Sequence, residues 1–172
     1  MKQVLYILGE FEDADIEWLL ETGRKVPVPA GTPVIQQGEY TKSLFFVVGG
    51  SFFVTTTEKT DGAIARVGTG EVLGEISLID GHPPTATVTA DEGGMVLAIP
   101  RAELERKLEE DVGFAARFYR AMSVFLADRL RGMIQSAGGG TIQELEMDLE
   151  ELDTVSKAGI RFEHILNRLQ EY

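Results

Sequence analysis

A glycine-bounded stretch at residues 70–90 carries the side chains best suited to chemistry. It reads Gly-Glu-Val-Leu-Gly-Glu-Ile-Ser-Leu-Ile-Asp-Gly-His-Pro-Pro-Thr-Ala-Thr-Val-Thr-Ala. This pattern predicts a turn, a short helical turn from Glu75 to Ile79, a Pro-Pro corner and a strand. The free backbone N–H groups of a helix that follows a glycine attract an anion. Because Glu75 would repel a bare phosphate, it is better suited to accept hydrogen bonds from sugar hydroxyls beside the phosphate.

The same stretch resembles a known family. Residues 73–78 (Leu-Gly-Glu-Ile-Ser-Leu) and 85–88 (Thr-Ala-Thr-Val) closely resemble the phosphate-binding cassette of cyclic nucleotide-binding domains. The resemblance extends over about residues 8–136 and implies a β-jelly roll with an N-terminal helix and a long C-terminal helix. It also implies a ligand site of six residues: Gly74, Glu75, Ile76, Ser77, Thr85 and Ala86.

The resemblance also implies roles for these residues. Glu75 takes the place of the glutamate that accepts hydrogen bonds from the ribose 2′-hydroxyl, whereas outside this context it would be interpreted as a solvated turn residue. The backbone amides of Gly74, Ile76 and Ser77 would face the cyclic phosphate. Thr85 is similar to the threonine of members that read cyclic GMP, although threonine is also a good strand residue. The expected ligand is cyclic AMP or cyclic GMP, with no other cofactor and no metal.

Pro84 stands where the family's cassette has its phosphate-binding arginine. Proline carries no charge and donates no backbone N–H. Losing one charge-assisted hydrogen bond costs about 1.5–3 kcal/mol, and leaving a desolvated phosphate unpaired costs about 2–5 kcal/mol. His82, Arg66 or Lys42 could supply a cation instead, and the spacing of these residues does not select among them.

Composition and charge exclude several other functions. The 172 residues include 28 acidic and 16 basic side chains, a formal charge of −12, which argues against nucleic acid and anionic lipid as partners. There is no cysteine, and the two histidines are far apart, so thiolate and multi-histidine metal sites are excluded. No nucleophile elbow or Walker loop is present, so an enzyme is not expected. Without an apolar run of about 18 residues we expect no transmembrane helix and a cytoplasmic protein.

The elements that must position the cassette are mostly short strands. Residues 13–22 predict an amphipathic helix that Gly23 ends. Gly49-Gly50 and Asp61-Gly62 predict hairpin turns, and the family has β-turns where glycines 31, 38, 50 and 70 fall. Strands are predicted at Val34–Gln36, Leu44–Val48, Phe52–Thr57, Ala63–Val67, Ala86–Ala90 and Met95–Ile99. So many short strands predict a sandwich or jelly roll.

Helical periodicity returns after this β-rich region. Pro100 suits a first helical position, and Asp111 is the expected N-cap of a long helix. One broad face of that helix is apolar: Phe114, Phe118, Met122, Phe125, Leu126, Leu130 and Met133. Gly138 to Gly140 predict a break, and Thr141 with Glu144 predicts a capping box. The expected domains are 1–137, a cyclic nucleotide-binding-like domain, and 138–172, an acidic helical extension.

These features favour a non-enzymatic regulatory module that couples a nucleotide-like ligand to helix rearrangement and a protein partner. In the family the long helix pairs with its mate in a parallel dimer, which implies a homodimer through residues 112–136. Since this helix is basic and the tail acidic, the tail is expected to fold back on it, within the chain or across a dimer. The alternative is a degenerate domain that has lost nucleotide binding and serves in protein–protein assembly, which Pro84 favours.

Overall fold

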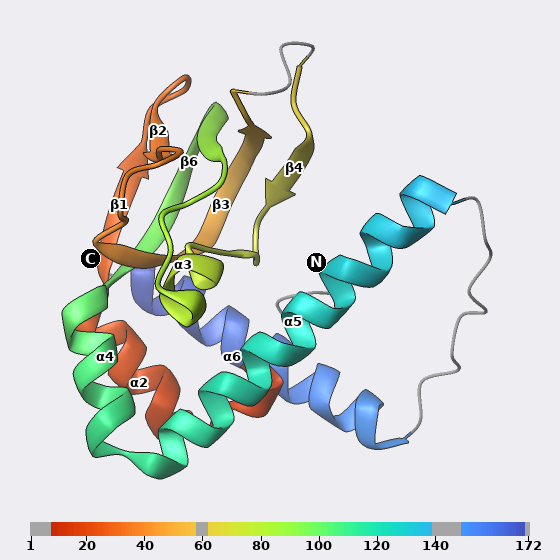
Figure 1. Cartoon of the computed structure of the whole chain (residues 1–172). Helices are drawn as coiled ribbons and strands as arrows, with labels where there is room; N and C mark the ends of the chain where they lie inside the picture. The colour runs from red at the N-terminus through yellow and green to blue at the C-terminus, as the bar shows by residue number, and fades with distance from the viewer. Residues whose placement is uncertain (1–7, 58–61, 139–148, 171–172) are drawn as a thin grey trace.

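The protein is described by a computed structural model that covers residues 8–57, 62–138 and 149–170. Within these ranges an antiparallel β-roll stands on a layer of helices (Figure 1). The sheet follows the order β1-β6-β3-β4, with β2 also paired to β6 and β5 to β3. Its strands are β1 (Arg24–Val28), β2 (Pro33–Ile35), β3 (Ser43–Thr55), β4 (Ala65–Gly68), β5 (Val72–Leu73) and β6 (Thr87–Pro100). The predicted fold class, mainly β with flanking helices, is confirmed.

Two long bulged strands replace four of the predicted short ones. Gly49 and Gly50 continue β3 opposite Met95 and Gly94 of β6, with register shifts on either side. The predicted hairpin turn at Gly49-Gly50 is therefore wrong: Gly50 has a φ of +85° and bends the strand without reversing it. The predicted hairpin between β3 and β4 is confirmed by their antiparallel pairing, while residues 58–61 of its connection lie outside the described ranges.

The helices follow the predicted order with small shifts at their ends. They are α2 (Asp13–Thr22), α3 (Glu75–Asp80), α4 (Arg101–Glu110), α5 (Val112–Gly138) and α6 (Leu149–Gln170). Pro100 is the N-cap of α4 and ends β6, so the helix begins at Arg101, one residue after the predicted first helical position. Asp111 caps α5 as predicted, because its Oδ1 accepts the Phe114 backbone N–H at 2.9 Å.

Aromatic rings join the long helix to the N-terminal part of the chain. The Phe11 and Phe114 rings stack with centroids 5.9 Å apart, and Trp18 meets Phe114 edge-on at 5.3 Å. Phe118 and Phe125 of α5 are also buried in this cluster. A second cluster, around Val47, Phe52 and Val96, fills the inside of the β-roll. The first cluster therefore fixes the half of α5 that follows α4.

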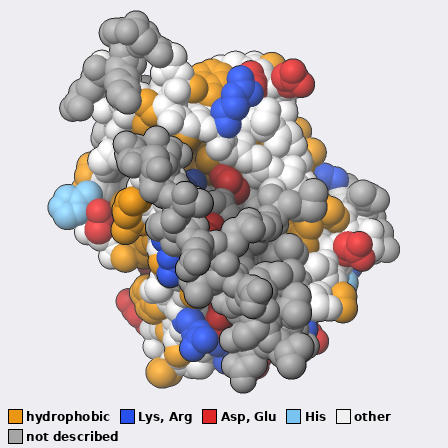
Figure 2. Space-filling model, turned by 90° about the vertical axis from the view of Figure 1, so that its right-hand side faces the viewer, with side chains coloured by type: hydrophobic (Ala, Val, Ile, Leu, Met, Phe, Trp, Pro, Cys, Tyr) orange, Lys and Arg blue, Asp and Glu red, His pale blue; other side chains and the backbone are white. Residues whose placement is uncertain are grey.

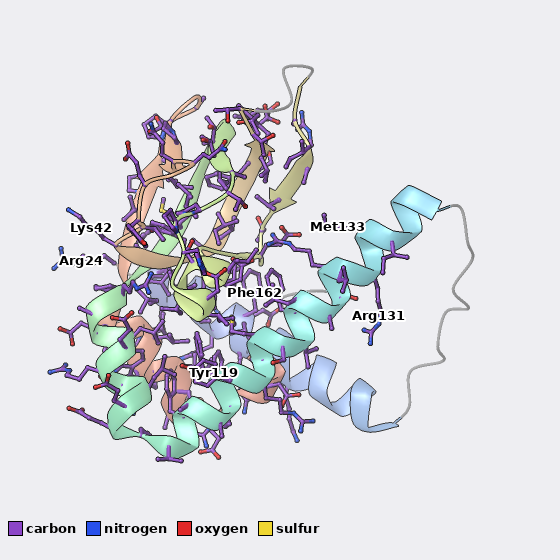
Figure 3. All side chains as sticks on the ribbon, in the orientation of Figure 1. Arg24, Lys42, Tyr119, Arg131, Met133 and Phe162 are labelled. Carbon is purple, nitrogen blue, oxygen red and sulfur yellow. The ribbon has the colours of Figure 1, made fainter. Side chains whose placement is uncertain are left out.

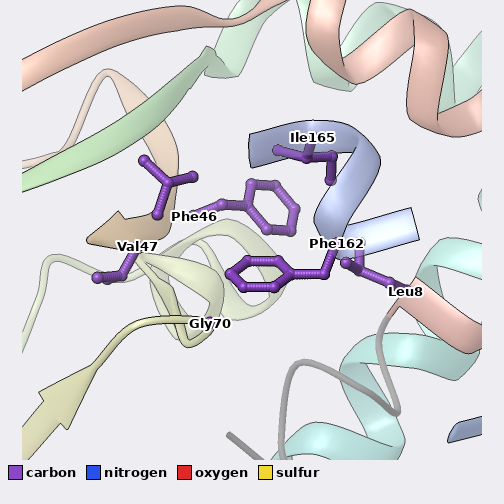
Figure 4. Close-up of a pocket in the computed structure, with 7 residues that line it drawn as sticks. Leu8, Phe46, Val47, Gly70, Phe162 and Ile165 are labelled. Atoms are coloured by element: carbon purple, nitrogen blue, oxygen red, sulfur yellow. The ribbon is translucent and has the colours of Figure 1, made fainter. Parts of the chain in front are cut away.

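The described part of the tail folds back onto the β-roll domain. Figure 4 shows Phe162 and Ile165 of α6 pointing toward Phe46 of β3, around a cavity of about 10 Å³. Arg161 donates to Asp13 at 2.9 Å, and His164 and Arg168 contact Glu17 at 2.6 and 3.1 Å. These polar contacts join α6 to α2, and charge pairing of the tail with the long helix, within the chain or across a dimer, stays a prediction. Basic residues of the tail meet acidic residues of α2.

The predicted boundary between a 1–137 domain and a 138–172 extension stays a prediction. Ala158 and Ile165 of α6 are buried in the same apolar cluster as α2 and α5. The predicted Thr141 capping box lies outside the described residues. Among the residues that the structure describes, no helix has the length and apolar character needed to cross a membrane.

Candidate functional site

The candidate ligand-binding segment begins at Gly74, between β5 and α3. Gly74 has a φ of +89°, in the left-handed region, and precedes the six-residue helix α3. A Cβ atom here would lie 3.2 Å from the Ser43 carbonyl oxygen. The positive φ and this close approach both favour glycine. The residue that follows, Glu75, is buried.

Glu75 is buried and forms an ion pair with the long helix. Its side chain is 3% exposed, and its Oε1 accepts a hydrogen bond from Nη1 of Arg129 at 2.6 Å. The Arg129 guanidinium carbon lies 4.9 Å from the centre of the Phe125 ring, one helical turn earlier on α5. A single contact therefore links the first residue of the cassette helix to α5.

Glu71 adds a second carboxylate beside the same guanidinium. Its Oε2 lies 3.9 Å from Nη2 of Arg129, too far for a hydrogen bond, and among the described residues it has no hydrogen-bond partner. Burial raises the pKa of Glu71 and of Glu75, and in both cases the positive charge of Arg129 opposes the rise. The site thus contains two carboxylates and one guanidinium that are largely shielded from solvent.

The other predicted site residues differ in exposure. Ser77 is buried, whereas the Ile76 side chain points outward and is 49% exposed. Thr85 is exposed and Ala86 is half-buried in the segment that leads into β6. The carbonyl of Pro84 accepts the Gly38 backbone N–H at 2.8 Å, which fixes this segment against the turn after β2. That the six residues share one ligand stays a prediction.

Three basic residues were candidates to replace the arginine that is missing at position 84. Each of them pairs with an acidic residue or lies in another part of the molecule. Arg66 pairs with Asp91 and its side chain is 70% exposed. The His82 side chain is 79% exposed and faces Asp80. Figure 3 places Lys42 on the side of the molecule opposite the end of α5 that carries Arg131 and Met133. The cation that contacts Glu75 is Arg129 of α5, which the cassette pattern does not indicate.

A second arginine contacts the middle of the cassette helix. Nη1 of Arg101, the first residue of α4, donates to the Ser77 carbonyl at 3.1 Å, and its Nε donates to Glu105 at 2.7 Å. The cassette helix α3 is therefore connected to α4 through Arg101 and to α5 through Arg129. No group of three or more potential metal ligands occurs in the described part of the chain.

Comparisons with known proteins agree with this geometry. The sequence pattern of the cyclic nucleotide-binding domain family matches residues 25–111, half of the chain. A Pycsar effector protein of Xanthomonas perforans is 28% identical over 114 residues, which are 66% of this chain and 37% of that protein. A cyclic nucleotide-gated potassium channel of Mesorhizobium japonicum is 36% identical over 78 residues, 45% of this chain and 21% of the channel. The chain thus spans well under half the length of these relatives.

A solved structure shows the same fold. The crystal structure of a cyclic nucleotide-binding domain from Methylobacillus flagellatus KT superimposes with a TM-score of 0.71. It is 22% identical, and the match covers 84% of this chain and 85% of that one. Together with the match over residues 25–111, the β-roll, the cassette helix and the long helix show that the chain belongs to the cyclic nucleotide-binding domain family of regulatory domains.

Proposed function

We propose that this chain is a non-enzymatic sensor module that binds a cyclic nucleotide beside Glu75 and reports binding through α5. The observation that carries the proposal is the Glu75–Arg129 ion pair, because it joins the cassette to the long helix. A ribose hydroxyl that donates to Glu75 must displace or share Nη1 of Arg129. The ligand therefore has different affinities for different positions of α5, which is what coupling requires.

The contacts of α3 support transmission in both directions. Displacement of the cassette helix acts on α4 through the Arg101–Ser77 hydrogen bond and on α5 through Arg129. Packed helices respond to such small shifts by moving between discrete arrangements. In this proposal cyclic AMP or cyclic GMP is the input and the position of α5 is the output.

Thermal unfolding with added ligand tests the proposal. A ligand present at about 100 times its dissociation constant stabilises the folded state by about 2.7 kcal/mol. For a chain of this size we expect the melting temperature to rise by roughly 5–10 °C. Cyclic AMP, cyclic GMP and cyclic dinucleotides are added at millimolar concentration, with adenosine 5′-monophosphate as the control for weak anion binding. If none of the cyclic compounds raises the melting temperature more than this control, the proposed ligand class is wrong.

The proposed partner is a second copy of the chain, bound through the outer face of α5. Residues on this face follow a 4-3 spacing that is typical of coiled-coil seams: Val112, Ala116, Tyr119, Ser123, Leu126, Leu130 and Met133. Val112, Leu130 and Met133 are 79%, 58% and 65% exposed. Figure 2 shows the right-hand side of the Figure 1 view, where some hydrophobic side chains are exposed among charged ones. One seam with this spacing is self-complementary across a two-fold axis.

Sedimentation velocity of a Leu130→Glu variant tests this partner. Burying a leucine contributes about 1.5–3 kcal/mol, so its replacement by a charge is expected to weaken dimerisation at least about tenfold. Ile160→Glu is the matched control, because Ile160 is 68% exposed on α6 and lies outside the seam. A monomeric wild-type protein, or equal weakening by both variants, would count against the seam. Dimerisation without any response to nucleotide would instead identify the alternative function, an assembly module.

A further inference from the structure

Arg129 carries the one positive charge that contacts Glu75 in the described structure. We propose that Arg129 is the residue that binds the anionic group of the ligand, so that α5 supplies the cation that position 84 lacks. This inference rests on the proposed function and adds to it the side chain that recognises the ligand's charge. It assigns one arginine to two tasks, binding the ligand and holding α5 against the cassette.

The contacts of Arg129 keep its guanidinium at the site even when Glu75 changes partner. A hydroxyl that donates to Glu75 replaces Nη1 at Oε1, a 2.6 Å contact. The stacking on Phe125, at 4.9 Å, does not depend on Glu75 and retains the head group nearby. A guanidinium presents five N–H donors in a planar fork, which suits two oxygens of a phosphate. Arg129 can therefore pass from the carboxylate to the phosphate without leaving the site.

The charges around Glu75 make this cation necessary for an anionic ligand. Glu71, Glu75 and Arg129 carry charges of −1, −1 and +1 when all are ionised, a sum of −1. Without Arg129 the sum is −2. Charges in such a partly buried site are screened less by solvent than surface charges are. A monoanionic ligand would then face two carboxylates with no compensating charge.

Two neighbouring arginines, Arg101 and Arg131, are not placed to bind the anionic group beside Glu75. Arg101 contacts the Ser77 carbonyl of α3 and not the Glu75 carboxylate, and it is paired with Glu105. Arg131 is exposed, and Figure 3 shows its side chain directed away from the sheet. It therefore provides a matched control, an arginine two residues along the same helix that does not contact Glu75.

The competing interpretation is that Arg129 only occupies Glu75 and blocks the ligand. The two interpretations predict opposite signs for Arg129→Gln. If Arg129 binds the anionic group, we expect the affinity for cyclic AMP or cyclic GMP to fall about 10- to 100-fold. If Arg129 is only a competitor, the same variant binds cyclic nucleotide more tightly. Adenosine and guanosine, which lack the phosphate, should bind the variant at least as well as they bind the wild type.

The experiment measures dissociation constants by calorimetry for the wild type, Arg129→Gln, Arg131→Gln, Pro84→Arg and the double variant Pro84→Arg with Arg129→Gln. We expect Arg131→Gln to match the wild type. We expect Pro84→Arg to strengthen binding and to reduce the loss caused by Arg129→Gln to less than about threefold, since two residues that supply the same charge are coupled. If Arg129→Gln does not fold, Arg129→Lys is measured in its place. Because lysine keeps the positive charge, this variant should still bind the cyclic nucleotide more tightly than the corresponding nucleoside.

The outcomes separate the two proposals. If the wild type binds cyclic nucleotide and Arg129→Gln binds it equally or more tightly, the proposed role of Arg129 is wrong, but the proposed sensor function is not contradicted. Binding by Pro84→Arg but not by the wild type overturns both, because it shows that Arg129 does not replace the missing cation. Loss of binding in Arg129→Gln with recovery in the double variant supports both.

Discussion

Replacing Arg117 with methionine is expected to lower the free energy of unfolding by about 3–5 kcal/mol. The Arg117 side chain binds Asp15 through two hydrogen bonds, Nε to Oδ2 at 2.7 Å and Nη2 to Oδ1 at 2.9 Å. The Asp15 side chain is only 4% exposed. Methionine keeps most of the apolar stem but removes the charge, so a buried carboxylate is left without its cation. Urea unfolding measures the change.

An exposed ion pair on the same helix provides the control. Arg120 binds Glu10 at 2.7 Å, but its side chain is 72% exposed, and exposed pairs contribute about 0–1 kcal/mol. Arg120→Met should therefore leave stability nearly unchanged. Equal losses in the two variants would mean that burial of Asp15 does not determine the cost. An Asp15→Asn and Arg117→Met double variant should recover part of the loss, because it removes the buried charge together with its partner.

Arg117 and Arg129 connect two parts of α5 to different elements of the protein. Arg117 holds the first turns of the helix to α2, among the aromatic rings of Phe11, Phe114 and Phe118. Arg129 holds the helix to the cassette through Glu75, twelve residues later. Loss of Arg117 is therefore expected to reduce stability, whereas loss of Arg129 is expected to alter ligand response. The two arginines share a helix but act on different properties.

The sequence was sufficient for the fold and for the position of the cassette. The cassette segment between Leu73 and Val88 has a specific pattern of glycine, glutamate and proline residues. This pattern predicted α3 between a glycine and a Pro-Pro corner. The long strands β3 and β6 were divided into pairs of short ones because glycine pairs usually mark turns. Whether Gly49-Gly50 reverses a strand or bulges it depends on the partner strand, which local sequence does not specify.

The sequence carries a signal for the ion pair at the candidate site. Arg129 follows Phe125 by four residues and Met122 by seven, so it continues the buried face of α5. A charge on a buried face requires a partner of opposite charge. Glu75 is that partner, but it lies 54 positions earlier, and only the tertiary arrangement brings the two together.

The docking of α6 depends on apolar contacts that the charge pattern does not describe. A basic long helix and an acidic tail predicted that they attract each other. In the structure Arg161, His164 and Arg168 of the tail contact acidic residues of α2. Exposed ion pairs are weak, so the docking is set by the apolar contacts of Phe162 and Ile165 with the cluster around Phe46. Apolar burial therefore holds α6 against a cluster that includes residues of both α2 and α5, and the ion pairs with α2 add to it.

The bulge in β3 gives the second prediction, for Gly50→Ala. At Gly50 a Cβ atom would lie 2.3 Å from the Gly93 carbonyl oxygen and 2.6 Å from the Gly94 Cα. These are backbone atoms of β6, so they cannot rotate away as a side chain would. The positive φ costs about 1–2 kcal/mol for alanine, and overpacking adds about 1–3 kcal/mol. We expect Gly50→Ala to lower the free energy of unfolding by about 2–5 kcal/mol.

Gly31→Ala separates the two causes, because Gly31 has a φ of +74° but no heavy atom within 4 Å of its ideal Cβ position. It should lose only the backbone cost, about 1–2 kcal/mol. The excess loss in Gly50→Ala then measures the close approach of β3 to β6. Urea unfolding of both variants gives this difference, and equal losses would show that the approach can relax. A large excess would mean that the backbones of β3 and β6 cannot move apart at Gly50 to accommodate a methyl group.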